Sequence, residues 1–139
     1  SERDVLDRVK AACRNSAVYN TGGELNLAQA IALTERLEGL VCNDSGAMHI
    51  AAALKVPTVA IFGPTEFNAT YPYSNRALIV RREGLECSPC MLRECPIDHP
   101  CMTQISVDAV AGAVDRILKQ TRKATAGEAP SFHEMMVHV

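Results

Sequence analysis

The 139-residue chain is long enough to bury one core, and 47% of its residues are apolar, which predicts a single folded domain. Its 14 basic and 16 acidic residues leave a formal charge of −2, so no net positive field would attract nucleic acid or anionic lipid. The most apolar stretches, residues 47–54 and 107–118, are too short to span a bilayer, and residues 1–4 lack the pattern of a signal peptide. We therefore expect a cytoplasmic protein with no nucleic-acid partner and no transmembrane segment.

Apolar residues recur at helical spacing over residues 2–14, 27–37, 47–54 and 107–118. Short β-prone runs lie at residues 17–20, 40–43, 58–62 and 77–80. Because strands alternate with helices, the predicted fold class is α/β, a doubly wound parallel sheet covered on both faces. Residues 1–119 form this domain. We expect little order in the tail, residues 120–139, although its end from Phe132 is apolar enough to dock.

Three of the predicted strands are followed by glycine-containing loops, namely residues 21–23, 44–46 and 63–65. Ligands bind at the carboxyl ends of the strands in an open parallel sheet, so we expect these loops to line one crevice. Each loop alone is a common turn. Their shared placement is what indicates a site.

The second loop has the features of an anion site. Gly46 lies where the following helix exposes its unpaired amides, Ser45 offers a hydroxyl, and His49 offers an imidazole from the first turn. A carboxylate repels phosphate, so Asp44 is expected to cap the helix, orient His49 or bind sugar hydroxyls. The plainer alternative is a turn with a helix cap, with His49 packing among alanines. A serine nucleophile is disfavoured because Asn43 occupies the position that needs glycine.

Four of the six cysteines fall within fifteen residues, with the spacing Cys87-x2-Cys90-x4-Cys95-x5-Cys101, and His99 lies inside the last interval. Cys87 and Cys90 have the knuckle spacing of a zinc site, but the second pair is looser. Zinc, an iron–sulfur cluster, a disulfide and reduced thiols all remain open, as does a metal-stabilised interaction module. The other two cysteines, Cys13 and Cys42, read as small hydrophobic residues.

Residues 43–54, NDSGAMHIAAAL, and residues 56–65, VPTVAIFGPT, resemble the C-terminal domain of family 9 glycosyltransferases, the lipopolysaccharide heptosyltransferases. Residues 87–102 of the cysteine loop resemble the second-heptose branch of that family. The similarity runs from Tyr19 to Leu118, and the joint occurrence of these segments is more specific than any one of them.

The resemblance implies a GT-B glycosyltransferase with two Rossmann-like halves. The C-terminal half holds ADP-heptose, and the N-terminal half holds the lipid A–core acceptor at the inner face of the bacterial inner membrane. Transfer inverts the anomeric centre by direct displacement and needs no cofactor, although a structural metal in the cysteine loop stays open. A related GT-B domain for another nucleotide sugar is the alternative.

The resemblance also implies how the second loop would hold the donor. Asp44 would meet heptose hydroxyls, Ser45 and Gly46 would hold the pyrophosphate at the helix that Ala47 opens, and His49 would lie beside it.

Further donor contacts implied by the resemblance lie earlier in the chain. Leu25 would contact adenine, Thr21 and Gly22 would border the same pocket, and Glu2 corresponds to a ribose-binding glutamate. The family's first C-terminal strand, with a phosphate-binding lysine, and the N-terminal half, with its carboxylate base, lie outside this chain. It therefore contains no expected catalytic residue and should not catalyse transfer alone.

Overall fold

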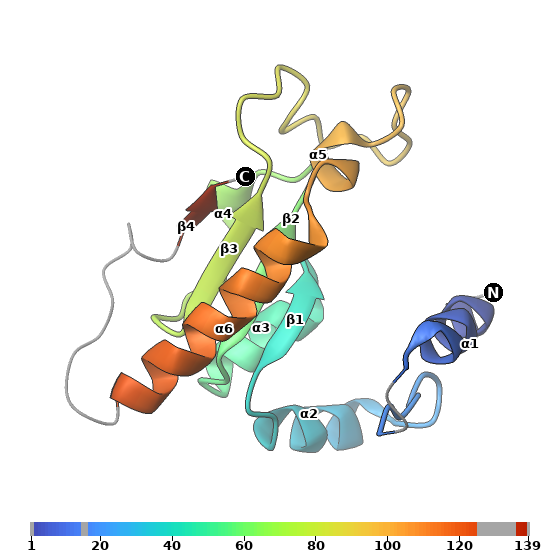
Figure 1. Ribbon diagram of the computed structural model, residues 1–139, viewed down its shortest axis with the longest axis vertical. Coiled ribbons are helices and arrows are strands. Elements are labelled where there is room, and N and C mark those ends of the chain that lie inside the picture. Colours follow the sequence, from blue (N-terminus) through green and yellow to red (C-terminus); the bar gives the residue numbers. More distant parts are fainter. Residues whose placement is uncertain (1, 15–16, 125–135, 139) are drawn as a thin grey trace. The chain divides into compact units, whose positions relative to one another are not determined.

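The computed structural model describes residues 2–14, 17–124 and 136–138. It divides into two compact units, residues 1–33 and residues 34–139, which are described separately. The elements, labelled in Figure 1, are α1 (Glu2–Ala12), α2 (Leu27–Glu35), β1 (Leu40–Asn43), α3 (Gly46–Ala53), β2 (Thr58–Phe62), α4 (Phe67–Thr70), β3 (Ala77–Arg81), α5 (Pro100–Thr103), α6 (Val107–Ala124) and β4 (Met136–His138). None of these described helices is both long and apolar enough to cross a membrane.

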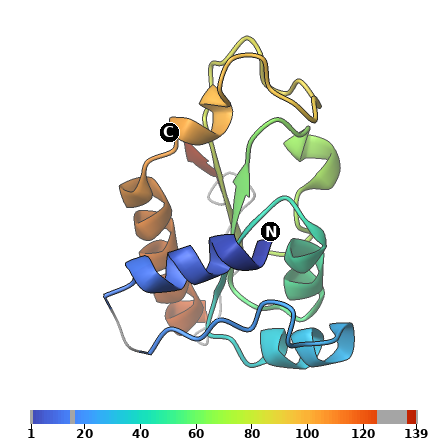
Figure 2. The same cartoon turned by 90° about the vertical axis from the view of Figure 1, so that its right-hand side faces the viewer.

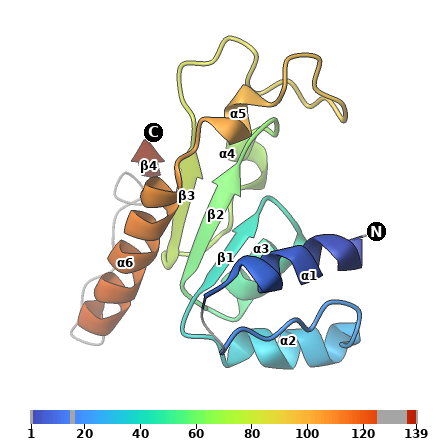
Figure 3. The same ribbon diagram turned by 45° about the vertical axis from the view of Figure 1, so that its right-hand side comes forward.

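The second unit is built on a sheet with the strand order β1-β2-β3-β4, in which every neighbouring pair is parallel. The arrows of β1, β2 and β3 point the same way in Figure 3. The apolar runs at residues 40–43 and 58–62 form strands with the predicted bounds, and the third strand continues one residue past its predicted end, to Arg81. Runs without alternation form strands here because both faces of β2 and β3 are covered.

Helices cover both faces of the sheet, as Figure 2 shows with α6 on one side and α3 on the other. Alternate side chains of a strand point to opposite faces, and the two halves of the core follow that rule. One half joins α6 to the sheet through Val59, Leu78, Val80, Ala113 and Ile117. The other joins α3 to it through Met48, Ala60, Phe62 and Ile79. The predicted α/β class with a doubly covered parallel sheet is confirmed.

The strand predicted at residues 17–20 is wrong. These residues form a turn and an irregular segment, and Tyr19 is 84% exposed. The Asn20 side chain donates to Asp7 Oδ1 at 2.9 Å and accepts from the Gly22 amide at 3.0 Å. A β-prone run needs a neighbouring strand to form a ladder, and side-chain bonds of this kind favour a turn instead.

The helix that follows begins at a capping box. The Asn26 amide donates to Gln29 Oε1, the Gln29 amide donates to Asn26 Oδ1, and both distances are 2.9 Å. This reciprocal pair satisfies two amides that a helix start leaves unpaired, which explains why α2 begins at Leu27.

The segment of residues 120–139, for which the sequence predicts little order, contains two regular elements. Helix α6 continues through residues 120–124, and the strand β4 pairs with β3. Residues 125–135 and 139 lie outside the described part of the chain. At its other end, α6 is capped as predicted, because Ser106 Oγ accepts from the Ala109 amide at 3.1 Å.

Candidate functional site

The carboxyl edge of the sheet brings together the turn after β1 and the segment after β2. The Asp44 amide donates to Ile61 O at 3.2 Å, which extends the β1–β2 ladder by one bond. Ser45 then takes the N-cap position of α3, with an extended backbone (φ −159°, ψ 170°), and Gly46 is the first helical residue. This is the strand–turn–helix arrangement that the sequence predicts for residues 40–54.

The start of α3 is open to a ligand. The Ser45 side chain makes no capping hydrogen bond, and the first amides of a helix have no partner within it. A Cβ atom placed on Gly46 would meet nothing within 4 Å, so packing does not require glycine there. Uncommitted amides, a free hydroxyl and the positive end of the helix dipole favour an anion at this point.

His49 follows in the first turn of α3 and is exposed, whereas Met48 beside it is fully buried in the core. Helix α3 therefore packs on the core through its buried residues Met48, Ala51 and Ala52. The alternative in which His49 serves only to pack among alanines is wrong, because its side chain faces solvent.

Asp44 does not cap the helix, since that position belongs to Ser45. Its carboxylate Oδ2 accepts a hydrogen bond from Thr70 Oγ1 at 3.1 Å, and Thr70 also donates to Glu66 O at 3.3 Å. Glu66 in turn caps α4 by accepting from the Asn68 amide at 3.1 Å. Thr70 was not among the predicted site residues, because nothing in the sequence after residue 65 links it to Asp44.

The Asp44 carboxylate affects the pKa of the neighbouring Cys42 thiol. Burial raises the pKa of Cys42, and the Asp44 carboxylate raises it further because it disfavours a second negative charge nearby. Cys42 packs against the core cluster beneath α3, as expected of a small hydrophobic residue.

Arg81 supplies a positive charge at the same edge. It is the last residue of β3, and its Cζ lies 4.0 Å from the centroid of the Phe67 ring in α4, a cation–π distance. The strand predicted from the sequence ends at Val80, one residue before Arg81, so Arg81 was not among the predicted site residues. An arginine at the end of the third strand complements a site for a diphosphate.

The third loop, residues 63–65, packs against α5 on the side of Gly63, and its part in a donor crevice stays a prediction. A Cβ on Gly63 would lie 2.5 Å from Met102 Sδ, so this glycine makes room for α5. Ser88 Oγ donates to Gly63 O at 3.0 Å, and the amides of Cys90 and Met91 donate to Pro64 O at 3.1 and 2.9 Å. The loop therefore supports the cysteine-rich segment.

The earlier predicted contacts belong to the first unit. Thr21 O accepts from the Glu24 amide at 3.1 Å, a Cβ on Gly22 would overlap the Leu6 side chain, and Leu25 is 37% exposed. Glu2 begins α1, and its side chain lies outside the described residues. The part of these residues in a donor site stays a prediction.

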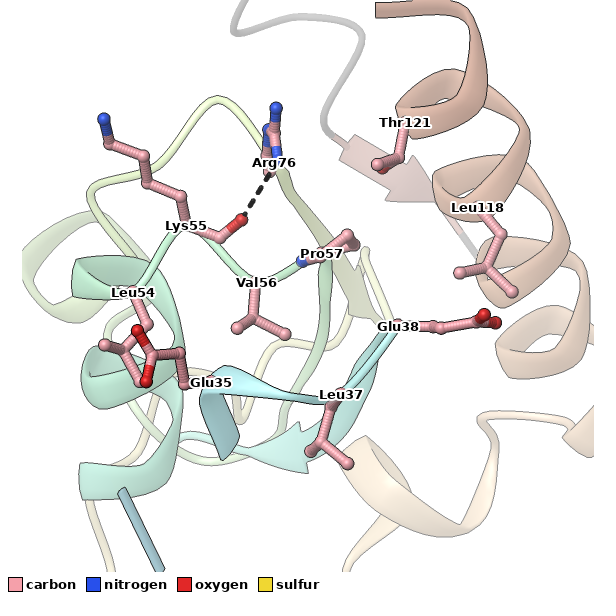
Figure 4. Close-up of a pocket in the computed structure, with 10 residues that line it drawn as sticks. All are labelled: Glu35, Leu37, Glu38, Leu54, Lys55, Val56, Pro57, Arg76, Leu118 and Thr121. Atoms are coloured by element: carbon pink, nitrogen blue, oxygen red, sulfur yellow. Dashed lines mark hydrogen bonds between the residues drawn. The ribbon is translucent and has the colours of Figure 1, made fainter. Parts of the chain in front are cut away.

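A hollow of about 400 Å³ lies at the opposite end of the strands, where Arg76 Nη1 donates to Lys55 O at 3.4 Å (Figure 4). Pro57 and Arg76 directly precede β2 and β3. Ligands of open α/β sheets bind at the carboxyl ends of strands, so this hollow is not the candidate site.

Comparison with known proteins shows which family the chain belongs to. The model of "Glycosyltransferase family 9 (heptosyltransferase)" matches residues 1–100. The chain is 36% identical over 115 residues to lipooligosaccharide heptosyltransferase 2 of Campylobacter jejuni, which is 82% of this chain and 33% of that protein. It is 44% identical over 72 residues to lipopolysaccharide heptosyltransferase 2 of Escherichia coli, which is 52% of this chain and 19% of that protein.

A solved structure agrees with these relatives. The structure of E. coli ADP-heptose lps heptosyltransferase II superposes with a TM-score of 0.71 and 30% identity, covering 87% of this chain and 34% of that one. The structural match and the family match both place the chain among the glycosyltransferases. It belongs to glycosyltransferase family 9, the heptosyltransferases. The chain spans about a third of the length of the Campylobacter relative and less of the E. coli one.

Proposed function

We propose that this chain is the ADP-heptose-binding half of an inverting heptosyltransferase that adds heptose to the inner core of lipopolysaccharide. The observation that carries the proposal is the start of α3, where Gly46 leaves space beside unpaired amides and the Ser45 hydroxyl is not used as a cap. The printed names of the relatives support heptose as the sugar.

In the proposed complex, the pyrophosphate of the donor lies at the first turn of α3, held by Ser45 and the amides of Gly46 and Ala47, with His49 beside it. Asp44 accepts hydrogen bonds from heptose hydroxyls, because Thr70 holds its carboxylate at the carboxyl edge of the sheet. For the first unit by itself, the family resemblance predicts that Leu25 contacts adenine, that Thr21 and Gly22 border that pocket, and that Glu2 binds the ribose.

The proposed transfer is a direct displacement. A hydroxyl of the lipid A–core acceptor attacks the anomeric carbon on the face opposite ADP, the bond to ADP breaks, and the configuration inverts. The helix amides and Ser45 stabilise the negative charge that develops on the departing diphosphate. The acceptor proton passes to a carboxylate base of an N-terminal half outside this chain. No cofactor takes part, and the reaction occurs at the inner face of the bacterial inner membrane.

Calorimetric titration of the chain with ADP-heptose and with ADP tests the division of roles. Asp44→Ala should weaken binding of ADP-heptose but not of ADP, because only the sugar meets the carboxylate. Ser45→Ala should weaken both, because both carry the pyrophosphate. If Asp44→Ala leaves the affinity for ADP-heptose unchanged in a folded sample, the proposed sugar contact is wrong.

The nucleotide sugar itself is tested by competition. ADP-heptose should displace bound ADP more effectively than a UDP-sugar does, because Leu25 is proposed to contact adenine. Equal or stronger competition by the UDP-sugar would favour the alternative, a family member that uses another donor.

A further inference from the structure

Two groups of reactive or charged side chains after β3 take no part in the proposed donor contacts. The first lies in the cysteine-rich segment, where an enclosed cavity of about 60 Å³ has a lining that includes Cys87, Cys90, Cys95, His99 and Cys101. Within the described residues no three His, Cys, Asp or Glu side chains are arranged to hold a metal ion, and the cysteines are free. This cavity therefore does not fit the structural metal that the cysteine spacing left open. The second group is the guanidinium of Arg81.

The Arg81 side chain lies on the face of the sheet that α3 covers. Alternate residues of a strand point to opposite faces, and Ile79, two residues earlier, is buried in the half of the core that includes Met48 of α3. Phe67, the first residue of α4, packs against the same half of the core. The Arg81 guanidinium, whose Cζ lies 4.0 Å from the centroid of the Phe67 ring, is therefore held at the end of β3 by an aromatic ring that the core itself fixes.

The charge of Arg81 has no counter-charge in the described part of the chain. The side chain is half-buried, it contacts the Phe67 ring, and its guanidinium makes no hydrogen bond or ion pair with the described residues. By contrast, Nε of the adjacent Arg82 donates to Gln104 Oε1 at 2.9 Å. A partly buried charge without a partner is unfavourable, and the N–H groups of Arg81 remain as a planar set of donors that matches an oxyanion.

The two carboxylates associated with α4 are bonded to other groups. Asp44 Oδ2 accepts from Thr70 Oγ1 at 3.1 Å. Glu66 Oε1 accepts from the Asn68 amide at 3.1 Å and from the Asn68 side chain at 3.0 Å. Neither carboxylate therefore neutralises Arg81.

Helix α4 links Arg81 to the proposed sugar contact. Phe67 and Thr70 are the first and last residues of this four-residue helix, and they contact Arg81 and Asp44 respectively. An anion held by Arg81 would thus lie beside the sugar that Asp44 is proposed to bind.

We propose that Arg81, stacked on Phe67, binds an oxyanion of a substrate, a phosphate or carboxylate group, through paired N–H donors of its guanidinium. This inference rests on the proposed function, which offers two sources of the anion. One is the diphosphate of the donor, and the other is an acidic group of the acceptor.

Titration of the 139-residue chain with inorganic phosphate tests the proposal, with the Arg81 Nε–H and Phe67 amide resonances as the readout. Both should shift with millimolar phosphate and stay in place when sodium chloride is raised to the same ionic strength. The Nε–H of Arg82 is the internal control, because it already donates to Gln104. If phosphate leaves the Arg81 Nε–H unmoved in a folded sample, the proposal is wrong.

Variants of the two arginines provide a second measurement. Arg81→Met keeps an unbranched side chain and removes the charge, so the phosphate affinity read at the Phe67 amide should fall at least about tenfold. Arg81→Lys, which keeps the charge but loses the planar donors, should fall between the two. Arg82→Met is the matched control and should bind phosphate like the parent. Parental affinity in Arg81→Met would overturn the proposal, and the unaltered chain decides the matter if that variant does not fold.

The source of the anion is tested by repeating the phosphate titration on the chain saturated with ADP. If ADP alone shifts the Arg81 Nε–H and phosphate then adds nothing, the anion is the donor diphosphate. If ADP leaves that resonance in place and phosphate still shifts it, the anion belongs to the acceptor. The donor site is read separately, at the amides of Gly46 and Ala47, so either site can fail while the other responds.

Discussion

Thr70 Oγ1 donates a hydrogen bond to Asp44 Oδ2 at 3.1 Å, across 26 residues of sequence. The bond joins the turn after β1 to the last residue of α4, which follows β2. It directs one carboxylate oxygen toward Thr70 and fixes the side chain at the edge of the sheet. We interpret Thr70 as the residue that positions Asp44 for a sugar.

Replacing Thr70 with valine preserves the side-chain shape and removes the hydroxyl. A hydrogen bond of this kind contributes about 1 kcal/mol, so we expect the affinity for ADP-heptose to fall about fivefold and the affinity for ADP to stay the same. The matched control is Thr121→Val, whose hydroxyl donates to Ile117 O within α6. Equal losses for ADP and ADP-heptose would show that Thr70 does not act through the sugar contact.

Gly46→Ala should separate binding from folding. A Cβ there meets no neighbour within 4 Å, and alanine favours a helix over glycine by up to about 1 kcal/mol. The variant should therefore be at least as stable as the parent in thermal unfolding, yet bind ADP at least about tenfold more weakly, because the methyl group would occupy the space proposed for the diphosphate.

The control for this change is Gly112→Ala, an equally open glycine on α6. It should gain similar stability and keep its affinity for ADP. If Gly46→Ala also binds ADP normally, the diphosphate does not lie at the start of α3.

The pH dependence of cysteine alkylation tests the electrostatic contact between Cys42 and Asp44. Burial and the carboxylate raise the pKa of Cys42, so its alkylation should reach half its maximal rate at a pH above the ordinary thiol pKa of 9.0. Asp44→Asn should lower this midpoint, and Asp108→Asn on α6 should not. Peptide-resolved mass spectrometry provides the measurement, and an unchanged midpoint in Asp44→Asn would contradict the assigned cause.

The same shift predicts the sign of a stability effect. Folding raises the pKa of this thiol, so the unfolded chain loses its proton first as pH rises. The contribution of Cys42 to stability is therefore complete below the ordinary thiol pKa of 9.0, and it falls as the pH rises through that value toward the higher pKa of the folded state.

Gly63→Ala should destabilise the fold by about 1 kcal/mol, because the new methyl group overlaps the half-buried Met102 side chain, which must then shift. Shortening that neighbour in the double variant Gly63→Ala/Met102→Ala should recover part of the loss. Chemical denaturation of the single and double variants measures both effects. Additive losses in the double variant would show that the glycine serves another purpose.

The strands β2 and β3 could be predicted because their apolar runs reflect burial on both faces, whereas β1 is half-buried and partly exposed. Residues 40–43 and 58–62 became β1 and β2 with the expected bounds. Ala17–Asn20 has similar β propensity but forms no strand, because propensity does not supply the partner that a ladder needs. The strand β4 could not be placed, since the tail that contains it lacks a sustained pattern.

The candidate site was predictable where its residues are contiguous. Ser45, Gly46 and His49 lie on the predicted turn and first helical turn, and all three are exposed. Contacts between distant segments were not predictable, because the bond from Thr70, the Arg81–Phe67 pair and the space that Met102 takes beside Gly63 depend on tertiary packing.

The most direct test of the proposed donor site is a titration of the chain with ADP-heptose, monitored through backbone amide resonances. The amides of Gly46 and Ala47 should shift first and furthest, with His49 following, while Gly112 stays unchanged. A folded sample in which millimolar ADP-heptose perturbs none of the amides at the start of α3 would contradict the proposed donor site.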